Sequence, residues 1–448
     1  MNLLALGLTV GLVAAYLRRH YLWFTCGVFF LLSADIVVLR IGSISFSPVF
    51  AAALLLSPLM LDRYHKTAQY RTFVVLLFSL CVFALVSVVM AILMLQFYPE
   101  LLASNVSVTT LWTRGGVSTV QFGALVVLAF LLTYATRSSS TGLRTVLLSI
   151  GTAVGLGLLL NVTGLFQSDV MSSFMRSDLQ LRYTGLNGEP RALARTAAVA
   201  LLLLLLTWDR RKSGTYVVAA AGLMGALILA TSTSALGALL VSAGATGGWL
   251  LLTRRKWSRV PLLLLPLALV ALLPTLNPAG WDEYVSVRVD RLATGTSSPV
   301  DALEIFDRAA VLVFYNHPEL LLFGVGNNMI SFPASSYTTA RDRSIFGDQI
   351  RSVPHMGILR LGASLGVSGC IIFIMFFFAV YRDMKCRPGG LFTIFVALSV
   401  FTAIVYTDLY IPLVGVLLGL QAKTRGLPDN LPEDGRLDIY RGQEGADW

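Results

Sequence analysis

Long apolar stretches alternate with short polar loops along most of the chain. The hydrocarbon core of a bilayer is about 30 Å thick, so an α-helix needs roughly 20 apolar residues to cross it. On that length we expect about thirteen membrane-spanning helices, within a range of roughly twelve to fourteen. The spans fall near residues 1–17, 21–39, 43–61, 72–98, 116–136, 145–166, 191–208, 215–231, 233–252, 260–275, 356–381, 391–407 and 409–422. The pattern predicts an all-α polytopic membrane protein.

Two longer polar segments, residues 167–190 and 276–355, interrupt this pattern. The longer one contains six arginines and two of the four histidines, but no lysine. A structureless loop of that length is uncommon unless it is functional or disordered. Because aromatic and aliphatic residues occur throughout it, we expect it to fold and to contain helices. We interpret residues 276–355 as the working part of the protein and the membrane helices as its scaffold.

The distribution of Lys and Arg predicts which loops face the cytoplasm. Alternate loops are short, and each of them is basic, which by the positive-inside rule makes them cytoplasmic. They contain Arg18/Arg19, Arg63/Lys66/Arg71, Arg137/Arg144, Arg210/Arg211/Lys212, Arg254/Arg255/Lys256/Arg259 and Arg382/Lys385/Arg387. The segments 167–190 and 276–355 then lie on the opposite, external side of the membrane. Every lysine falls on the cytoplasmic side. Arg suits two-point binding of phosphate oxygens better than Lys does, although a codon bias towards Arg would give the same pattern.

The chain therefore divides into four parts. Residues 1–275 hold the first ten helices and the smaller loop 167–190, residues 276–355 form the large external loop, and residues 356–422 hold the last three helices. Residues 423–448 form a cytoplasmic tail rich in Pro, Gly and acidic residues, in which we expect little fixed structure. The composition, 56% hydrophobic and 13% charged, agrees with a membrane protein. Membrane topology and anionic lipid headgroups account for the net charge of +10, so we expect membrane lipids and no nucleic acid as partners.

The first candidate site ends the loop 167–190. It contains Arg182, Glu189, Arg191 and Arg195, and Pro190 is suited to the first turn of the following helix. Arg191 and Arg195 are four residues apart and therefore share one face at the outer end of a span. Because a charge at mid-bilayer costs about 2.5–3.5 kcal/mol or more, the pair indicates a wet cavity or an anionic partner. Alternatively, Glu189 pairs with one arginine while the others extend to lipid headgroups.

The second candidate site lies in the large loop. Apolar residues at helical spacing between positions 303 and 314 predict an amphipathic helix that ends before Pro318 and contains Arg308. Arg308 either contributes to a site or forms only a surface i,i+4 pair with Glu304. A tight glycine turn, Gly324-Val-Gly326, follows. We interpret the acidic residues of this loop as solvated partners of its arginines, and His317 as a structural histidine.

The third candidate site is the start of the span after the large loop, with Arg351 and His355. In a regular helix, Gly362, Gly366 and Gly369 lie within about 40° of His355, at 100° per residue. Small residues in a row allow a second helix to approach closely. We therefore expect His355 to face a helix–helix contact. No spacing typical of metal ligands or of a phosphate-binding loop occurs, so we expect no metal and no cofactor.

These segments, in this order, resemble the Wzy / O-antigen ligase superfamily of surface-polysaccharide enzymes. The stretch from His355 to Gly369 is similar to the family's motif of His, a polar residue, nine residues, Gly, two residues and Gly, with Met356 at the polar position. Arg351 and Gly362 have the spacing seen in Wzy polymerases. Arg308 and the Gly-x-Gly turn, and the stretch from Gly185 to Ala194, resemble further family segments. Residues 232–237 lack the Arg found in many ligases, which favours a polymerase.

The resemblance implies a GT-C-like membrane glycosyltransferase that is inverting and independent of metal. Its donor would be a growing glycan on undecaprenyl pyrophosphate, and its acceptor the non-reducing end of another lipid-linked repeat unit. His355 would be the general base, and Arg308 would stabilise the leaving pyrophosphate together with Arg182, Arg191 and Arg351. Glu189 would orient an arginine or the substrate. A chain-length regulator protein is an expected partner.

Three alternatives stay open. The nearest is an O-antigen ligase, which transfers glycan to lipid A core. A lipid-linked oligosaccharide flippase is a different class, and it would place cations along the interior of its spans, whereas here the spans are nearly free of charge. A scaffold protein without chemistry would tolerate replacement of His355.

Overall fold

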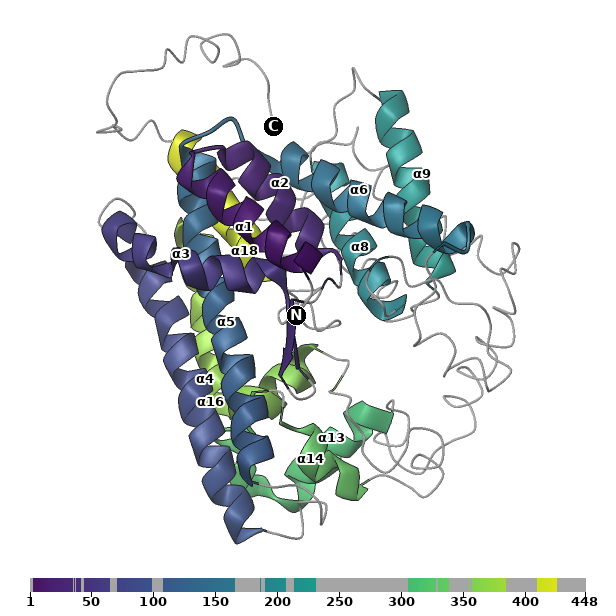
Figure 1. Ribbon diagram of the computed structural model, residues 1–448. Coiled ribbons are helices and arrows are strands. Elements are labelled where there is room, and N and C mark those ends of the chain that lie inside the picture. Colours follow the sequence, from purple (N-terminus) through teal and green to yellow (C-terminus); the bar gives the residue numbers. More distant parts are fainter. Residues whose placement is uncertain are drawn as a thin grey trace, which may run out of the picture.

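The computed structural model describes residues 3–34, 36, 38–41, 44–64, 71–98, 108–165, 186, 190–206, 213–230, 305–327, 329–337, 354, 357–383 and 409–424. Within these residues the fold is helical apart from one short hairpin (Figure 1). The longer helices are α1 (Leu3–Leu17), α2 (Tyr21–Leu32), α3 (Pro48–Tyr64), α4 (Arg71–Phe97), α5 (Val108–Arg137), α6 (Leu143–Val162), α8 (Pro190–Leu206), α9 (Ser213–Leu229), α13 (Ile305–Asn316), α16 (Gly357–Asp383) and α18 (Tyr410–Thr424).

In the part of the chain that the structure describes, four helical segments are long and apolar enough to cross a membrane. They are Val74–Phe97 in α4, Thr109–Arg137 in α5, Leu143–Val162 in α6 and Leu359–Phe376 in α16. Further apolar helices in the described part have 10–17 residues. The prediction of a helical membrane-embedded protein is therefore confirmed at this level, while thirteen spans and a GT-C-like arrangement stay predictions. The predicted spans 233–252, 260–275 and 391–407 lie outside the described residues.

The prediction of two uninterrupted helices over residues 21–39 and 43–61 was wrong in its details. Helix α2 ends at Leu32, and α3 begins only at Pro48. Strands β1 (Leu39–Ile41) and β2 (Ile44–Phe46) lie between them and pair antiparallel, with Leu39 opposite Phe46. The apolar residues of this stretch alternate with polar ones, a period that suits a strand better than a helix.

Among the described helices, α5 and α18 make the most extensive contact and lie side by side. A Cβ atom on Gly415 would collide with the backbone of Ala129, and one on Gly419 would lie 2.6 Å from the carbonyl oxygen of Thr133. The Thr133 hydroxyl lies 2.8 Å from the Ala129 carbonyl oxygen and 3.0 Å from that of Gly415. Two glycines four residues apart thus bring two backbones together, as in membrane helix pairs.

The described part of the large loop folds as a small unit, here called the loop lobe (residues 305–327 and 329–337). It contains α13, the 3-10 turns η5 (Pro318–Leu321) and η6 (Ser335–Tyr337), and the short α14 (Ser331–Ala334). In Figure 1 the lobe lies at the lower end of the molecule, beside α4 and α5. Its buried residues form a second core with side chains of α4, α5 and α16, namely Val88, Ala91, Ile92, Leu95, Leu111 and Ala363. The expectation that this segment folds is therefore confirmed for the described residues.

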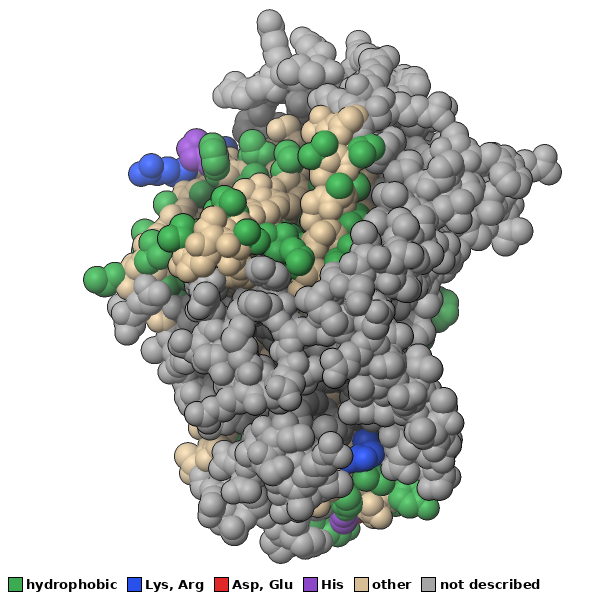
Figure 2. All heavy atoms as spheres, turned by 90° about the vertical axis from the view of Figure 1, so that its right-hand side faces the viewer, with side chains coloured by type: hydrophobic (Ala, Val, Ile, Leu, Met, Phe, Trp, Pro, Cys, Tyr) green, Lys and Arg blue, Asp and Glu red, His purple; other side chains and the backbone are tan. Residues whose placement is uncertain are grey.

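Apolar side chains also reach the surface of the helical part. Viewed from the right-hand side of Figure 1, hydrophobic side chains are spread over the described upper region, and a basic side chain appears near the lower end (Figure 2). Several large ones are well exposed, among them Leu3, Trp23 and Phe97 at 72–80%. A surface of this kind suits contact with lipid.

Candidate functional site

Helix α13 positions Arg308 at the edge of the second core. The predicted helix is present and ends at Asn316, two residues before Pro318. Ala309, Ala310 and Val313 are buried against the membrane helices, while the Arg308 side chain is half-buried. The apolar face therefore fixes the helix, and Arg308 lies at the margin of the buried face.

One expectation about the acidic residues of the loop was wrong. Asp307, beside Arg308, is only 4% exposed instead of being solvated. Burial of a carboxylate requires compensating polar partners, because removing a charge from water is costly. The small side chains of Ala309 and Ala310 let α13 approach the membrane helices closely, which takes its first turn out of solvent.

The glycine turn after α13 adopts left-handed backbone geometry. Gly324 has φ 74° and Gly326 has φ 87°, values that favour glycine strongly. The Val325 N–H donates a hydrogen bond of 2.7 Å to the carbonyl oxygen of Ala363 in α16. The weak sequence signal of this Gly-x-Gly thus corresponds to a real turn, and the turn attaches the loop lobe to α16.

Helix α16 is broken where this turn meets it. Gly366 has φ 68° and ψ −171°, so residues 357–365 and 367–383 form two helical segments. The expectation that Gly362, Gly366 and Gly369 share one face of a regular helix was therefore wrong beyond Gly366. A Cβ atom on Gly366 would meet the backbone of Leu321, Leu322 and Gly324, at 2.5–2.6 Å. The close partner of this glycine is the loop turn and not a second helix.

Hydrogen bonds from two serines connect the loop turn to α4 and to α16 at the break. The Ser87 hydroxyl of α4 lies 2.7 Å from the carbonyl oxygen of Phe323 and 2.6 Å from that of Ser364. The carbonyl oxygen of Leu322 accepts from Ser368, through the backbone N–H at 3.3 Å and the hydroxyl at 2.7 Å. Sequence analysis did not identify Ser87, although a serine within an apolar span, here one of two in α4, is a usable signal.

Most of the predicted site residues lie outside what the structure describes. His355, Arg351, Arg182 and Glu189 are outside the described residues, and Arg191 is described only in its backbone. Helix α8 begins at Pro190, as predicted. Helix α16 begins at Gly357, two residues after His355.

Three further arginines of the described residues are half-buried, namely Arg114, Arg195 and Arg360. Sequence analysis placed Arg195 in the first candidate site and gave Arg114 and Arg360 no role. The Arg114 guanidinium of α5 lies 5.0 Å from the ring centroid of Phe332, a cation–π contact between a membrane helix and the loop lobe. Arg195 lies in α8 beside the buried Ala194, and Arg360 lies in the first segment of α16.

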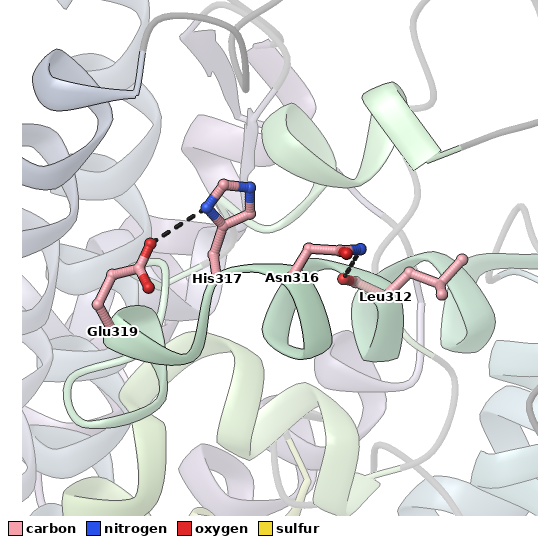
Figure 3. Close-up of polar contacts among 4 residues, drawn as sticks. All are labelled: Leu312, Asn316, His317 and Glu319. Atoms are coloured by element: carbon pink, nitrogen blue, oxygen red, sulfur yellow. Dashed lines mark hydrogen bonds and ion pairs between the residues drawn. The ribbon is translucent and has the colours of Figure 1, made fainter.

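A histidine–carboxylate pair lies at the end of α13. His317 Nδ1 lies 3.1 Å from Glu319 Oε1 (Figure 3). The His317 ring also makes edge contacts with Tyr98 and Tyr337, at centroid distances of 5.3 and 6.4 Å. Partial desolvation opposes ionisation of Glu319. Hydrogen bonds from its own backbone, from His317 and from Tyr98 outweigh that effect and lower its pKa. Since an ionised carboxylate only accepts, Nδ1 of His317 holds the hydrogen.

The interpretation of His317 as a structural histidine agrees with these contacts, which join the loop lobe to the end of α4. Among the described residues, no group of three or more His, Cys, Asp or Glu could hold a metal ion. No protein-family model matches the chain, and no curated protein matches it either.

Proposed function

We propose that the protein is a glycosyltransferase that polymerises a surface polysaccharide in the bacterial inner membrane, with its active site facing the periplasm. The donor is a glycan on undecaprenyl pyrophosphate, and the acceptor is the non-reducing-end sugar of another lipid-linked repeat unit. The acceptor hydroxyl oxygen attacks the anomeric carbon of the donor, and the bond from that carbon to the pyrophosphate oxygen breaks. The pyrophosphate leaves with the electron pair, and the configuration inverts.

His355 takes the proton from the acceptor hydroxyl. An imidazole with an unperturbed pKa near 6.5 is largely neutral at neutral pH and can act as a general base. Arg308, Arg182, Arg191 and Arg351 stabilise the charge that develops on the pyrophosphate, and Glu189 orients one of these arginines.

The observation that supports this proposal best is the packing of α13 on α16. Helix α13 presents Arg308 at its half-buried edge, and α16 begins two residues after His355. The hydrogen bond from Val325 to Ala363 joins the same two elements. A general base and a cation for the leaving group need a fixed separation, and this requirement agrees with a packed contact between α13 and α16.

The test uses purified protein in proteoliposomes with a lipid-linked repeat unit, and the products are separated on a gel. We expect a ladder of longer glycans. His355→Ala lowers turnover about 10²–10⁴-fold, as for loss of a general base. Arg308→Ala lowers it about 10²–10³-fold, as for loss of one group that stabilises developing charge.

Arg144→Ala is the matched control, because Arg144 is an exposed arginine at the start of α6, on the side predicted to be cytoplasmic. It keeps full activity. Unchanged chain extension in His355→Ala or in Arg308→Ala would remove that residue from the mechanism. Transfer to lipid A core without chain extension would replace the proposal with a ligase.

A further inference from the structure

We propose that the turn Leu321–Val325 is a re-entrant element that lies inside the hydrocarbon core of the membrane, in the leaflet nearer the loop lobe. Leu321 and Leu322 face the acyl chains of lipids there. The proposal concerns a segment that belongs, by sequence, to the large polar loop. It is independent of the enzymatic activity proposed above.

The depth of the turn follows from the two helices that it contacts. Ser87 lies sixteen positions after Arg71 at the start of α4, and Arg382, near the end of α16, lies sixteen positions after Gly366. At a rise of about 1.5 Å per residue, each stretch spans about 24 Å. The basic residues at those helix ends mark the cytoplasmic surface. Because the hydrocarbon core is about 30 Å thick, the turn lies within it, and any tilt of the helices places it deeper.

The backbone of the turn meets the main requirement for such a position. Irregular backbone at membrane depth needs protein partners for its polar groups, because lipid provides none. The Gly324 and Val325 N–H groups donate to the carbonyl oxygens of Leu320 and Ala363, at 2.8 and 2.7 Å. The carbonyl oxygens of Leu322 and Phe323 accept from Ser368 and Ser87.

The same contacts satisfy groups that the break frees in α16. The carbonyl oxygens of Ala363 and Ser364 accept from Val325 and Ser87, while Ser368 donates to the turn. A loop surrounded by water needs no such pairing, since water would hydrogen-bond the same groups. The turn and the broken helix are therefore joined as a single hydrogen-bonded element.

The side chains of the turn continue a lipid-facing surface. Leu321 is 42% and Leu322 is 56% exposed. The helices on which the turn packs also expose apolar side chains beside it, with Val86 on α4 at 38% and Val367 on α16 at 51%. An apolar groove lined by Val82, Phe83, Val86 and Ile372, among others, extends along α4 away from the turn. Phe83 stacks on Phe323 at a centroid distance of 6.1 Å, which joins the turn to that groove.

The occupant that fits this surface is lipid hydrocarbon. The residues that directly flank the two exposed leucines in the chain, Leu320 and Phe323, are also apolar. Val86 of α4 and Val367 of α16 both lie within segments that are long and apolar enough to cross the membrane. Acyl chains that cover those valines also reach the adjoining turn.

The test measures the accessibility of single cysteines in the full-length protein, reconstituted in lipid vesicles. In a background in which the four native cysteines are replaced by serine or alanine, Leu322→Cys is compared with Tyr315→Cys. Tyr315 is the matched control because it lies on α13 in the same lobe and is 81% exposed. A membrane-impermeant maleimide labels Tyr315→Cys rapidly and Leu322→Cys at least about tenfold more slowly. Equal labelling rates would overturn the proposal.

A second measurement distinguishes lipid from a covering protein. A nitroxide attached at Leu322→Cys collides more often with oxygen, which concentrates in hydrocarbon, than with a water-soluble nickel complex. The reference is the same label at Val86→Cys. A nitroxide shielded from both reagents would mean that protein covers the turn, and this would also overturn the proposal. Leu321→Cys provides the same two readouts if Leu322→Cys is not produced in folded form.

Discussion

Gly324 and Gly366 lie backbone against backbone, although 41 residues separate them in the chain. A Cβ atom on either residue would lie 2.5 Å from the backbone nitrogen of the other, and both have positive φ. One belongs to the loop lobe and the other to the break in α16. The contact therefore positions α13 relative to the helix that follows His355.

Gly366→Ala tests this contact. The extended conformation with positive φ is used essentially by glycine alone and costs an L-residue about 1–3 kcal/mol. The new methyl group also has backbone rather than a flexible side chain to displace. We expect a loss of at least about 2 kcal/mol, measured as a lower midpoint of thermal unfolding in detergent. The matched control is Gly362→Ala, because the nearest atom to its added Cβ is Cys370 Sγ at 3.9 Å. Similar midpoints for the two variants would contradict the geometry.

Ser87→Ala tests the hydroxyl that joins α4, the turn and α16. It leaves the Phe323 and Ser364 carbonyl oxygens without that donor, which costs about 1–3 kcal/mol for a buried group. We expect faster amide hydrogen exchange at Gly324 and Val325. The exchange rates along α4 stay unchanged. Ser79→Ala is the control, since among the described residues the Ser79 hydroxyl donates to the carbonyl oxygen of Val75 in its own helix. Unchanged exchange in Ser87→Ala would show that the hydroxyl does not stabilise the turn.

Glu319→Gln tests the pair with His317 and its dependence on pH. Because the pKa of Glu319 is lowered from 4.5 in the folded protein, its carboxylate stabilises the lobe above that pH and ceases to do so as the pH falls below it. At neutral pH we expect Glu319→Gln to lower the stability by up to about 1 kcal/mol, a value typical of partly exposed pairs. The difference from the unmodified protein vanishes well below pH 4.5. An equal difference at both pH values, in thermal unfolding of the purified protein, would exclude this role of the carboxylate.

Gly415→Ala tests the packing of α5 against α18. The added Cβ would strike the backbone of Ala129, so the two helices must separate and lose neighbouring contacts. We expect a loss of about 1–3 kcal/mol, as for overpacking elsewhere. Gly123→Ala on α5 is the control, because no atom lies within 4 Å of its added Cβ. Equal thermal midpoints for these two alanine variants would show that the close approach does not contribute to stability.

Local sequence patterns predicted several helices of this protein, because those patterns depend on interactions between residues close together in the chain. Apolar runs of about 20 residues indicate membrane helices wherever a bilayer excludes unpaired backbone groups. The period of the residues before Pro318 predicted α13, and Pro190 predicted the start of α8. Arg308 was placed on an amphipathic helix by the same argument.

The hairpin over residues 39–46 shows a limit of that approach. The hydrophobicity averaged over a window of residues can be the same for a strand and for a helix. The apolar stretch therefore did not reveal that its period changes from that of a helix to that of a strand. Likewise, the pair of His317 with Glu319 is local, but its third member, Tyr98, comes from more than 200 residues earlier in the chain. Only packing of the loop lobe on α4 brings these side chains together.

Gly366 in α16 illustrates the difference between what the sequence determines and what the tertiary structure determines. By itself the sequence established a helical, membrane-embedded protein with a foldable polar loop, because chain length and hydrophobic period depend on neighbouring residues only. Whether Gly366 continues a helix or interrupts it was decided by tertiary structure. Glycine permits both conformations, and the hydrogen bonds from Ser87 and Val325 compensate for those that α16 gives up at the break.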